Sequence, residues 1–188
     1  MKYIIPIIIL SFVLLSCSKE ESEEETITEL EGTWKTDCYT NSDNTSWIDT
    51  LTIAGNSITG NFEKHSDTSC STDYSTEGFN WTFSIGDAVT FSNGTGHKWT
   101  VTIGSTYKLT PQSDSAVSAF NSGSGECSKT DWVKDTEKEC STGTDKGDDL
   151  LCLYQLDGNT WYPKCDDSAY PSTSDIDTSD AEGSFTKQ

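Results

Sequence analysis

From Leu30 onward the chain alternates between apolar and polar positions in short segments that are separated by turn residues. The clearest segment places Phe79, Trp81, Phe83 and Ile85 at every second position, with polar residues between them. A period of two is typical of a β-strand that buries one face, because successive side chains of a strand point to opposite sides. The pattern therefore predicts a strand at 79–85 and fixes which of its faces is buried.

Similar signals recur along the chain and predict an all-β domain. Strands are expected at 33–39, 47–54, 58–65, 79–85, 88–92, 98–103, 106–110, 132–137, 150–156 and 160–162. Gly55-Asn56 predicts a tight hairpin turn, and Gly86-Asp87 predicts another turn. Strand starts recur at about every 10 to 12 residues, which favours an antiparallel up-and-down barrel with a β-sandwich as the alternative. One short helix is expected at 113–120, where apolar residues share one side.

The first sixteen residues have the three parts of a secretory signal. Lys2 supplies a positive start, residues 3–15 form an apolar run, and Ser16 is a small residue before Cys17. The run is about 13 residues long, which is too short to span a bilayer comfortably. Residues 1–16 are therefore interpreted as a signal peptide.

The end of this segment resembles the bacterial lipoprotein signal. That family has an aliphatic residue, a variable residue and a small residue before a cysteine, and Leu14, Leu15, Ser16 and Cys17 match this pattern. The resemblance implies cleavage before Cys17, acylation of its thiol and its new amino group, and a stable membrane anchor through several acyl chains, as in palmitate-modified lipoproteins. The alternative is an ordinary secreted protein in which Cys17 has no such role.

Residues 17–29 are expected to be the lipidated cysteine and an acidic tether. Lys19-Glu20-Glu21 resembles the lysine-plus-acids signal that sends lipoproteins of the Bacteroidota to the outer face of the outer membrane. The resemblance implies a lipid-anchored protein of the bacterial outer membrane that is exposed on the cell surface. The alternative is a solvated tether without sorting information.

The net charge limits the partners of the protein. The chain carries a formal charge of −19 and contains no arginine. A basic patch for nucleic acid is therefore excluded, and anionic lipid headgroups are repelled. The expected membrane contact is through acylated Cys17 alone.

Six cysteines remain after Cys17, and an even number in an exported domain predicts a disulfide framework. The expected pairing follows chain order and joins Cys38 to Cys70, Cys127 to Cys140, and Cys152 to Cys165. Six cysteines allow 15 connectivities, so other pairings stay open. A zinc site is the competing interpretation, but the chain lacks a Cys-x-x-Cys motif.

Gly32-Thr33-Trp34, at the start of the first expected strand, resembles the Gly-x-Trp motif of the lipocalins. The resemblance implies an eight-stranded (calycin-like) barrel, with Trp34 at its closed end and a small apolar ligand at its open end. Thr72-Asp73-Tyr74 matches a second lipocalin motif in letters but comes too early in the chain. The third motif centres on an arginine that packs on the tryptophan, and this chain has none.

Side chains for catalysis or metal binding do not form a recognisable motif. His65 and His97 are the only histidines, and neither lies in a known catalytic sequence pattern. Acidic residues cluster at 145–149 and 175–180, where a calcium site is the alternative to a solvated loop. We expect no catalytic residue, no metal and no cofactor.

These observations predict four segments: the signal peptide 1–16, the tether 17–29, the barrel 30–165 and an acidic, Ser/Thr-rich tail 166–188. The expected function is that of a non-enzymatic, lipid-anchored protein of the cell envelope that binds a small apolar ligand. The alternative is a structural or interaction lipoprotein of the cell surface that binds a protein partner and no internal ligand.

Overall fold

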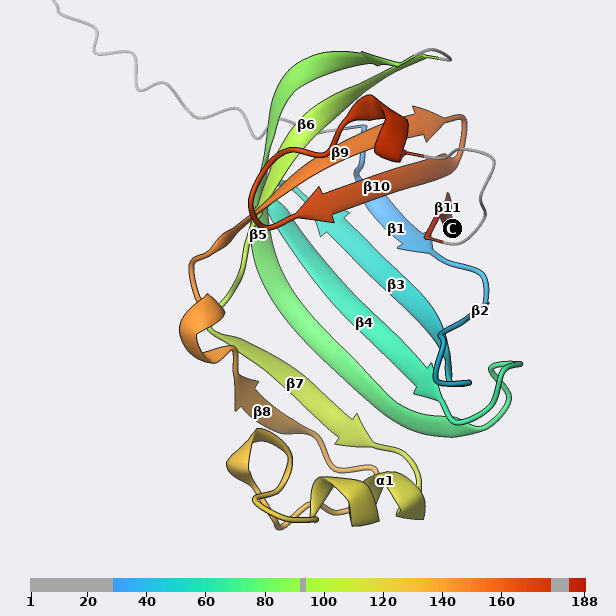
Figure 1. Ribbon diagram of the computed structural model, residues 1–188, viewed down its shortest axis with the longest axis vertical. Helices are drawn as coiled ribbons and strands as arrows, with labels where there is room; N and C mark the ends of the chain where they lie inside the picture. Colours follow the sequence, from blue (N-terminus) through green and yellow to red (C-terminus); the bar gives the residue numbers. More distant parts are fainter. Residues whose placement is uncertain (1–28, 92–93, 177–182) are drawn as a thin grey trace, which may run out of the picture.

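The computed structural model of the protein describes residues 29–91, 94–176 and 183–188, and nearly all of its regular structure is β (Figure 1). The strands are β1 (Gly32–Lys35), β2 (Tyr39–Thr40), β3 (Ser46–Ala54), β4 (Ser57–His65), β5 (Asp73–Phe91), β6 (Gly94–Thr102), β7 (Thr106–Pro111), β8 (Lys138–Ser141), β9 (Asp149–Asp157), β10 (Thr160–Asp166) and β11 (Phe185–Lys187). The helices are α1 (Asp114–Phe120) and three 3-10 turns, η1 (Glu126–Ser128), η2 (Gly143–Asp145) and η3 (Thr173–Asp175).

Eight of the strands close into an antiparallel barrel. Their order is β1, β3, β4, β5, β6, β9, β10 and β11, and β11 pairs with β1 to complete the ring. Every strand of this ring therefore has a neighbour on both sides, which removes open sheet edges. The predicted up-and-down barrel is confirmed, and the β-sandwich alternative is wrong.

The barrel continues downward into a smaller sheet because β5 is unusually long, with 19 residues. The C-terminal part of β5 pairs with β6, whereas residues Ser75 to Phe79 pair with β7, and β8 then pairs with β7. Figure 1 shows β7, β8 and α1 as a lower lobe beneath the barrel. The turn predicted at Gly86-Asp87 is wrong: β5 runs through these residues, and a register shift between Ile85 and Ala88 absorbs them as a β-bulge.

The helix predicted at 113–120 is confirmed, with Ser113 as its N-cap. The backbone N–H of Ala116 donates to the Ser113 hydroxyl over 3.1 Å. The strand predicted at 132–137 is wrong, since β8 begins only at Lys138. Trp132 is buried against Phe120 of α1, with ring centroids 5.4 Å apart, but it lies in a loop and not in a strand.

The barrel also reaches beyond the boundary of residue 165 that the sequence indicates. β11 belongs to the expected tail, yet it lies between β1 and β10. Phe185 is buried and packs against Trp161, with ring centroids 5.2 Å apart. Only one of the three side chains of β11 is buried, which is too few to produce a visible alternation.

Three disulfides join the six cysteines in chain order: Cys38–Cys70, Cys127–Cys140 and Cys152–Cys165. This is the pairing favoured by the sequence. The first bond holds the segment before β2 to the β4–β5 loop, the second braces the lower lobe, and the third links the adjacent strands β9 and β10. None of the helices in the described parts of the chain combines the length and apolarity needed to cross a membrane.

Candidate functional site

Aromatic side chains of β1, β6 and β10 fill one half of the barrel interior. Trp34, Trp99 and Trp161 are all buried, and the ring of Trp161 lies 5.7 Å from that of Trp34 and 5.3 Å from that of Trp99. The indole N–H of Trp34 donates to the carbonyl of Leu30 over 2.6 Å. The Nζ atom of Lys187 in β11 lies 5.1 Å from the Trp34 ring centre, so a lysine packs on this ring where the lipocalin resemblance implies an arginine.

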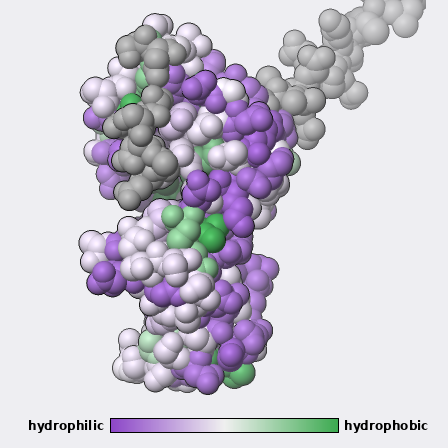
Figure 2. All heavy atoms as spheres, turned by 90° about the vertical axis from the view of Figure 1, so that its right-hand side faces the viewer, coloured by the Kyte–Doolittle hydropathy of each residue, from purple (hydrophilic) through white to green (hydrophobic). Residues whose placement is uncertain are grey.

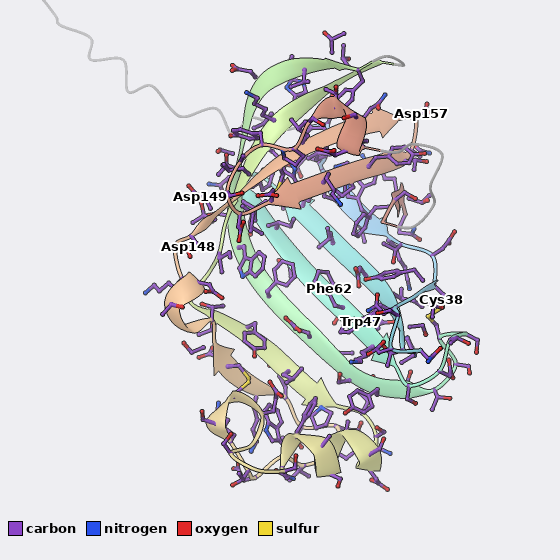
Figure 3. The ribbon with its side chains drawn as sticks, viewed as in Figure 1. Cys38, Trp47, Phe62, Asp148, Asp149 and Asp157 are labelled. Carbon is purple, nitrogen blue, oxygen red and sulfur yellow. A yellow bond between two sulfur atoms is a disulfide. The ribbon has the colours of Figure 1, made fainter. Side chains whose placement is uncertain are left out.

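The inner surface of the sheet continues below this filled half. On β3, β4 and β5, strand alternation puts further side chains on the same face as the buried Leu51, Ile58 and Phe79. We call this part of the sheet the lower inner face; it consists of Tyr39, Trp47, Asp49, Phe62, Lys64, Glu77 and Tyr107. Figure 3 shows Trp47 and Phe62 over the lower half of β3 and β4.

An aromatic shelf forms the upper boundary of the lower inner face. The ring of Phe79 lies 5.1 Å from Phe62 in an edge-on arrangement and stacks on Trp81 at 4.1 Å. Phe62 and Trp81 are only partly buried, although both pack against the core of the barrel. Apolar ring surface therefore remains in contact with solvent beside the filled interior.

The lower lobe forms the opposite boundary. Leu109, Phe120, Trp132 and Cys140 make a second hydrophobic cluster, and Tyr107 packs against both this cluster and the barrel core. The lower inner face thus lies between two hydrophobic clusters. Figure 2 shows a mostly hydrophilic surface in which apolar atoms gather in a small area between the upper and lower parts of the molecule.

Two carboxyl groups occupy this otherwise aromatic face. Asp49 Oδ2 accepts a hydrogen bond from the Tyr39 hydroxyl over 2.8 Å, whereas the buried Oδ1 has no hydrogen-bond partner in the described part of the chain. Burial raises the pKa of Asp49 above its ordinary value, and the bond from Tyr39 opposes this shift. Burial also raises the pKa of Glu77, and repulsion from the nearby charges of Glu126 and Asp49 adds to it.

Unpaired donors accompany these acids. The indole N–H groups of Trp47 and Trp81 are buried without a hydrogen-bond partner among the described residues. Lys64 lies between two aromatic rings, with its Nζ atom 5.2 Å from the Trp47 ring centre and 5.5 Å from that of Tyr74. A buried polar atom without a partner is costly, so the two indole N–H groups favour a bound molecule or solvent that supplies the missing hydrogen bonds.

The sequence pattern contains a signal for this face, although it is easily overlooked. Asp49 stands two residues before Leu51 and four before Ile53, in phase with the apolar positions of its strand. Glu77 has the same relation to Phe79 and Trp81. An acidic residue at an inward-facing position of a strand is unusual enough to mark a site.

The two histidines lie on different strands and face different acids. His65 is buried at the end of β4, and its Nδ1 atom is 3.4 Å from Asp73 Oδ1. His97 in β6 has Nε2 4.0 Å from Glu29 Oε1 and its ring stacked on Tyr154. Within the described residues, neither histidine is hydrogen-bonded to a serine.

The acidic stretch at 145–149 lies away from the lower inner face. Asp148 and Asp149 stand where β9 begins, on the opposite side of the view in Figure 3 from Trp47. Asp149 accepts a hydrogen bond from Thr102 over 2.7 Å. In residues 29–91, 94–176 and 183–188, no group of three or more His, Cys, Asp or Glu side chains is arranged to hold a metal ion.

The expected lipidation site Cys17 and residues 1–28 lie outside the described residues, as do Asp177 and Asp180. Glu29, at the end of the expected tether, accepts a hydrogen bond from the Tyr154 hydroxyl over 2.8 Å. This bond holds Glu29, the first described residue, to strand β9. Comparison of the chain with protein-family models and with curated protein sequences finds no match.

Proposed function

We propose that this protein is a lipid-anchored, non-enzymatic binding module of the bacterial outer membrane, and that it holds a small, mainly apolar ligand on the lower inner face. The observation that carries the proposal is the partly exposed aromatic surface of Phe62 and Trp81, which lies beside the buried and unpaired polar atoms of Trp47 and Asp49. Ligand sites combine an apolar lining with a few polar groups that fix orientation, and this face has that composition.

The filled half of the barrel is an unsuitable place for the ligand because the rings of Trp34, Trp99 and Trp161 already occupy it. Native interiors are close-packed, so a guest there would have to displace several large side chains. The ligand is therefore assigned to the lower inner face, where Phe62 and Trp81 of the aromatic shelf are only partly buried.

The binding test uses N-phenyl-1-naphthylamine, a probe that is uncharged at neutral pH and brightens in apolar surroundings. Phe62→Ala removes the centre of the shelf and is expected to weaken probe binding by about tenfold, since one large aromatic contact is worth about 1.5 kcal/mol or more. Val133→Ala is the control, because Val133 is 58% exposed and lies in the lower lobe. Equal probe binding by both variants, each shown to be folded by its thermal transition, would contradict the proposed site.

The anchor is tested separately. Cys17→Ala, expressed from the full-length gene in a Gram-negative host, is expected to move the protein from the membrane fraction to the soluble fraction because the acylated residue is lost. Cys17→Ala protein that still sediments with membranes would contradict the anchor. Protease treatment of intact cells then distinguishes surface display from a location facing the periplasm.

A second candidate function is an interaction lipoprotein without an internal ligand. It is favoured by the filled barrel interior, which leaves the outer surface and the lower inner face for contacts. Native mass spectrometry of protein purified from its own host separates the two candidates: a retained small molecule supports the binding module, and a stoichiometric protein partner supports the second candidate.

A further inference from the structure

Two carboxylates, Asp49 and Glu77, lie on the lower inner face, and the exposed Glu126 lies beside it. Asp49, Glu77 and Glu126 form no ion pair within the described part of the chain, where ion pairs involve other acids. The three groups are close enough that the charges of Asp49 and Glu126 act on Glu77. Glu77 and Glu126 likewise act on the hydroxyl of Tyr107, whose pKa is raised mainly by burial. The three carboxylates outnumber Lys64, the lysine of this face, so a net negative charge remains among the aromatic rings.

Within the described residues, no lysine forms an ion pair with these three carboxylates. Lys64 lies between the rings of Trp47 and Tyr74. Lys138 pairs with Asp131, with Nζ 2.6 Å from Oδ1, and Lys108 pairs with Glu137 over 2.8 Å. Because the whole chain has a charge of −19, the long-range field adds to the local attraction for a cation.

We propose that the lower inner face selects an organic ammonium ion with a short apolar body. The inference rests on the proposed function and specifies the chemical class of its ligand. The ammonium group donates a hydrogen bond to Asp49 Oδ1, the buried acceptor without a partner, and its charge offsets that of Glu77. The apolar body lies on Phe62 and Trp81, the exposed part of the aromatic shelf.

Charge selectivity distinguishes this site from a purely apolar one. A neutral ligand leaves the repulsion between the carboxylates in place, and an anionic ligand increases it. A partly buried ion pair with a matched cation gains more than an exposed pair, since less of the attraction is screened by solvent. The same body with a different head group should therefore bind with a different affinity.

The experiment compares three ligands with the same chain: octylammonium, 1-octanol and octanoate, each displacing N-phenyl-1-naphthylamine at pH 7. Octylammonium is expected to bind about tenfold more tightly than 1-octanol, and octanoate more weakly than either. Equal affinities for octylammonium and 1-octanol would overturn this inference and leave the proposed function standing. If the naphthylamine probe itself does not bind, the proposed function fails and this inference fails with it.

Matched variants test which carboxylates cause the preference for octylammonium over 1-octanol. Asp49→Asn and Glu77→Gln are each expected to weaken octylammonium binding by about fivefold, as loss of one ion-pair contact requires, and to leave 1-octanol binding unchanged. Glu63→Gln is the control, because Glu63 neighbours Phe62 in β4 but points to the outer face. Unchanged octylammonium binding in both inner-face variants would overturn the proposal.

A pH series gives an independent readout. The raised pKa values of Asp49 and Glu77 mean that these groups take up protons at a higher pH than ordinary carboxyls. Octylammonium binding should therefore weaken as the pH falls from 7 toward about 4, while 1-octanol binding stays constant. The other titratable groups facing these two are Tyr39, Lys64, Tyr107 and Glu126. A flat profile for octylammonium would count against the proposal.

Discussion

Closure of the barrel depends on a single buried side chain of β11, and Phe185→Ala tests this dependence. Phe185 is 7% exposed and packs on Trp161, with the two ring centroids 5.2 Å apart. The strand that carries Phe185 pairs with β1 on one side and β10 on the other. Loss of the Phe185 phenyl group therefore weakens the packing of β11, the strand that completes the barrel.

The expected cost follows from the size of the buried group. Replacing a buried phenylalanine by alanine usually costs 3 to 5 kcal/mol, and a short terminal strand can relax into part of the space, so we expect about 3 kcal/mol. For a domain of this length, that loss corresponds to a decrease in Tm of roughly 6 to 12 °C. The backbone bonds of β11, such as Lys187 N–H to the Asn159 carbonyl at 2.9 Å, remain available to the variant.

Urea denaturation measures the free energy of unfolding directly, provided that the slope of the transition stays the same. Thr186→Ala is the matched control: the residue lies in the same strand but is exposed, so its replacement should cost about 0.5 kcal/mol or less. If Phe185→Ala costs no more than Thr186→Ala, β11 does not complete the barrel and the reasoning from its packing is wrong.

Two further predictions concern strands β3 and β4 of the barrel. Gly60→Ala would place a Cβ atom 2.2 Å from the buried ring of Phe79, and it is expected to lower the free energy of unfolding, measured by urea denaturation, by about 2 kcal/mol. Gly78→Ala is the control, because its Cβ atom would meet nothing closer than 3.6 Å. Equal losses of stability in the two variants would contradict the argument. Asp49→Asn is expected to raise Tm at pH 7, because the raised pKa of Asp49 shows that its charged form is disfavoured in the folded protein. The wild-type protein regains this stability as acid protonates the group, so the difference in Tm should shrink toward about pH 4, and a constant difference would refute the assignment.

Local signals were sufficient for much of the fold. β3 and β4 follow from alternation and from the Gly55-Asn56 turn between them, and α1 follows from a capping serine before a short apolar face. The turn predicted at Gly86-Asp87 is wrong because the same residue types form both turns and β-bulges. Only the pairing of β5 with β6 distinguishes the bulge from a turn. The strand predicted around Trp132 is wrong for a related reason: an isolated aromatic residue indicates burial, but not whether the residue itself lies in a strand, a helix or a loop.

The candidate site was harder to predict from the sequence than the fold was. Trp47 is one of six tryptophans, and its place beside Asp49 and Lys64 depends on the register between β3 and β4. Tyr39 bonds Asp49 Oδ2, and Asp49 Oδ1 has no hydrogen-bond partner among the described residues; no local sequence pattern shows either fact. Side-chain pairing across a sheet is a long-range property, so a single sequence without aligned relatives does not determine it.

The length of β5 has a consequence for how the protein unfolds. Residues Ser75 to Phe79 have β4 on one side and β7 on the other, and residues Thr82 to Ile85 have β6 as a neighbour. One strand is thus a shared wall of the barrel and of the lower lobe, and neither part can open fully without breaking hydrogen bonds of β5. Amide hydrogen exchange should find the slowest protons of both parts on this strand, with a common free energy of opening. A molecule bound between the two parts would therefore protect both from exchange at once.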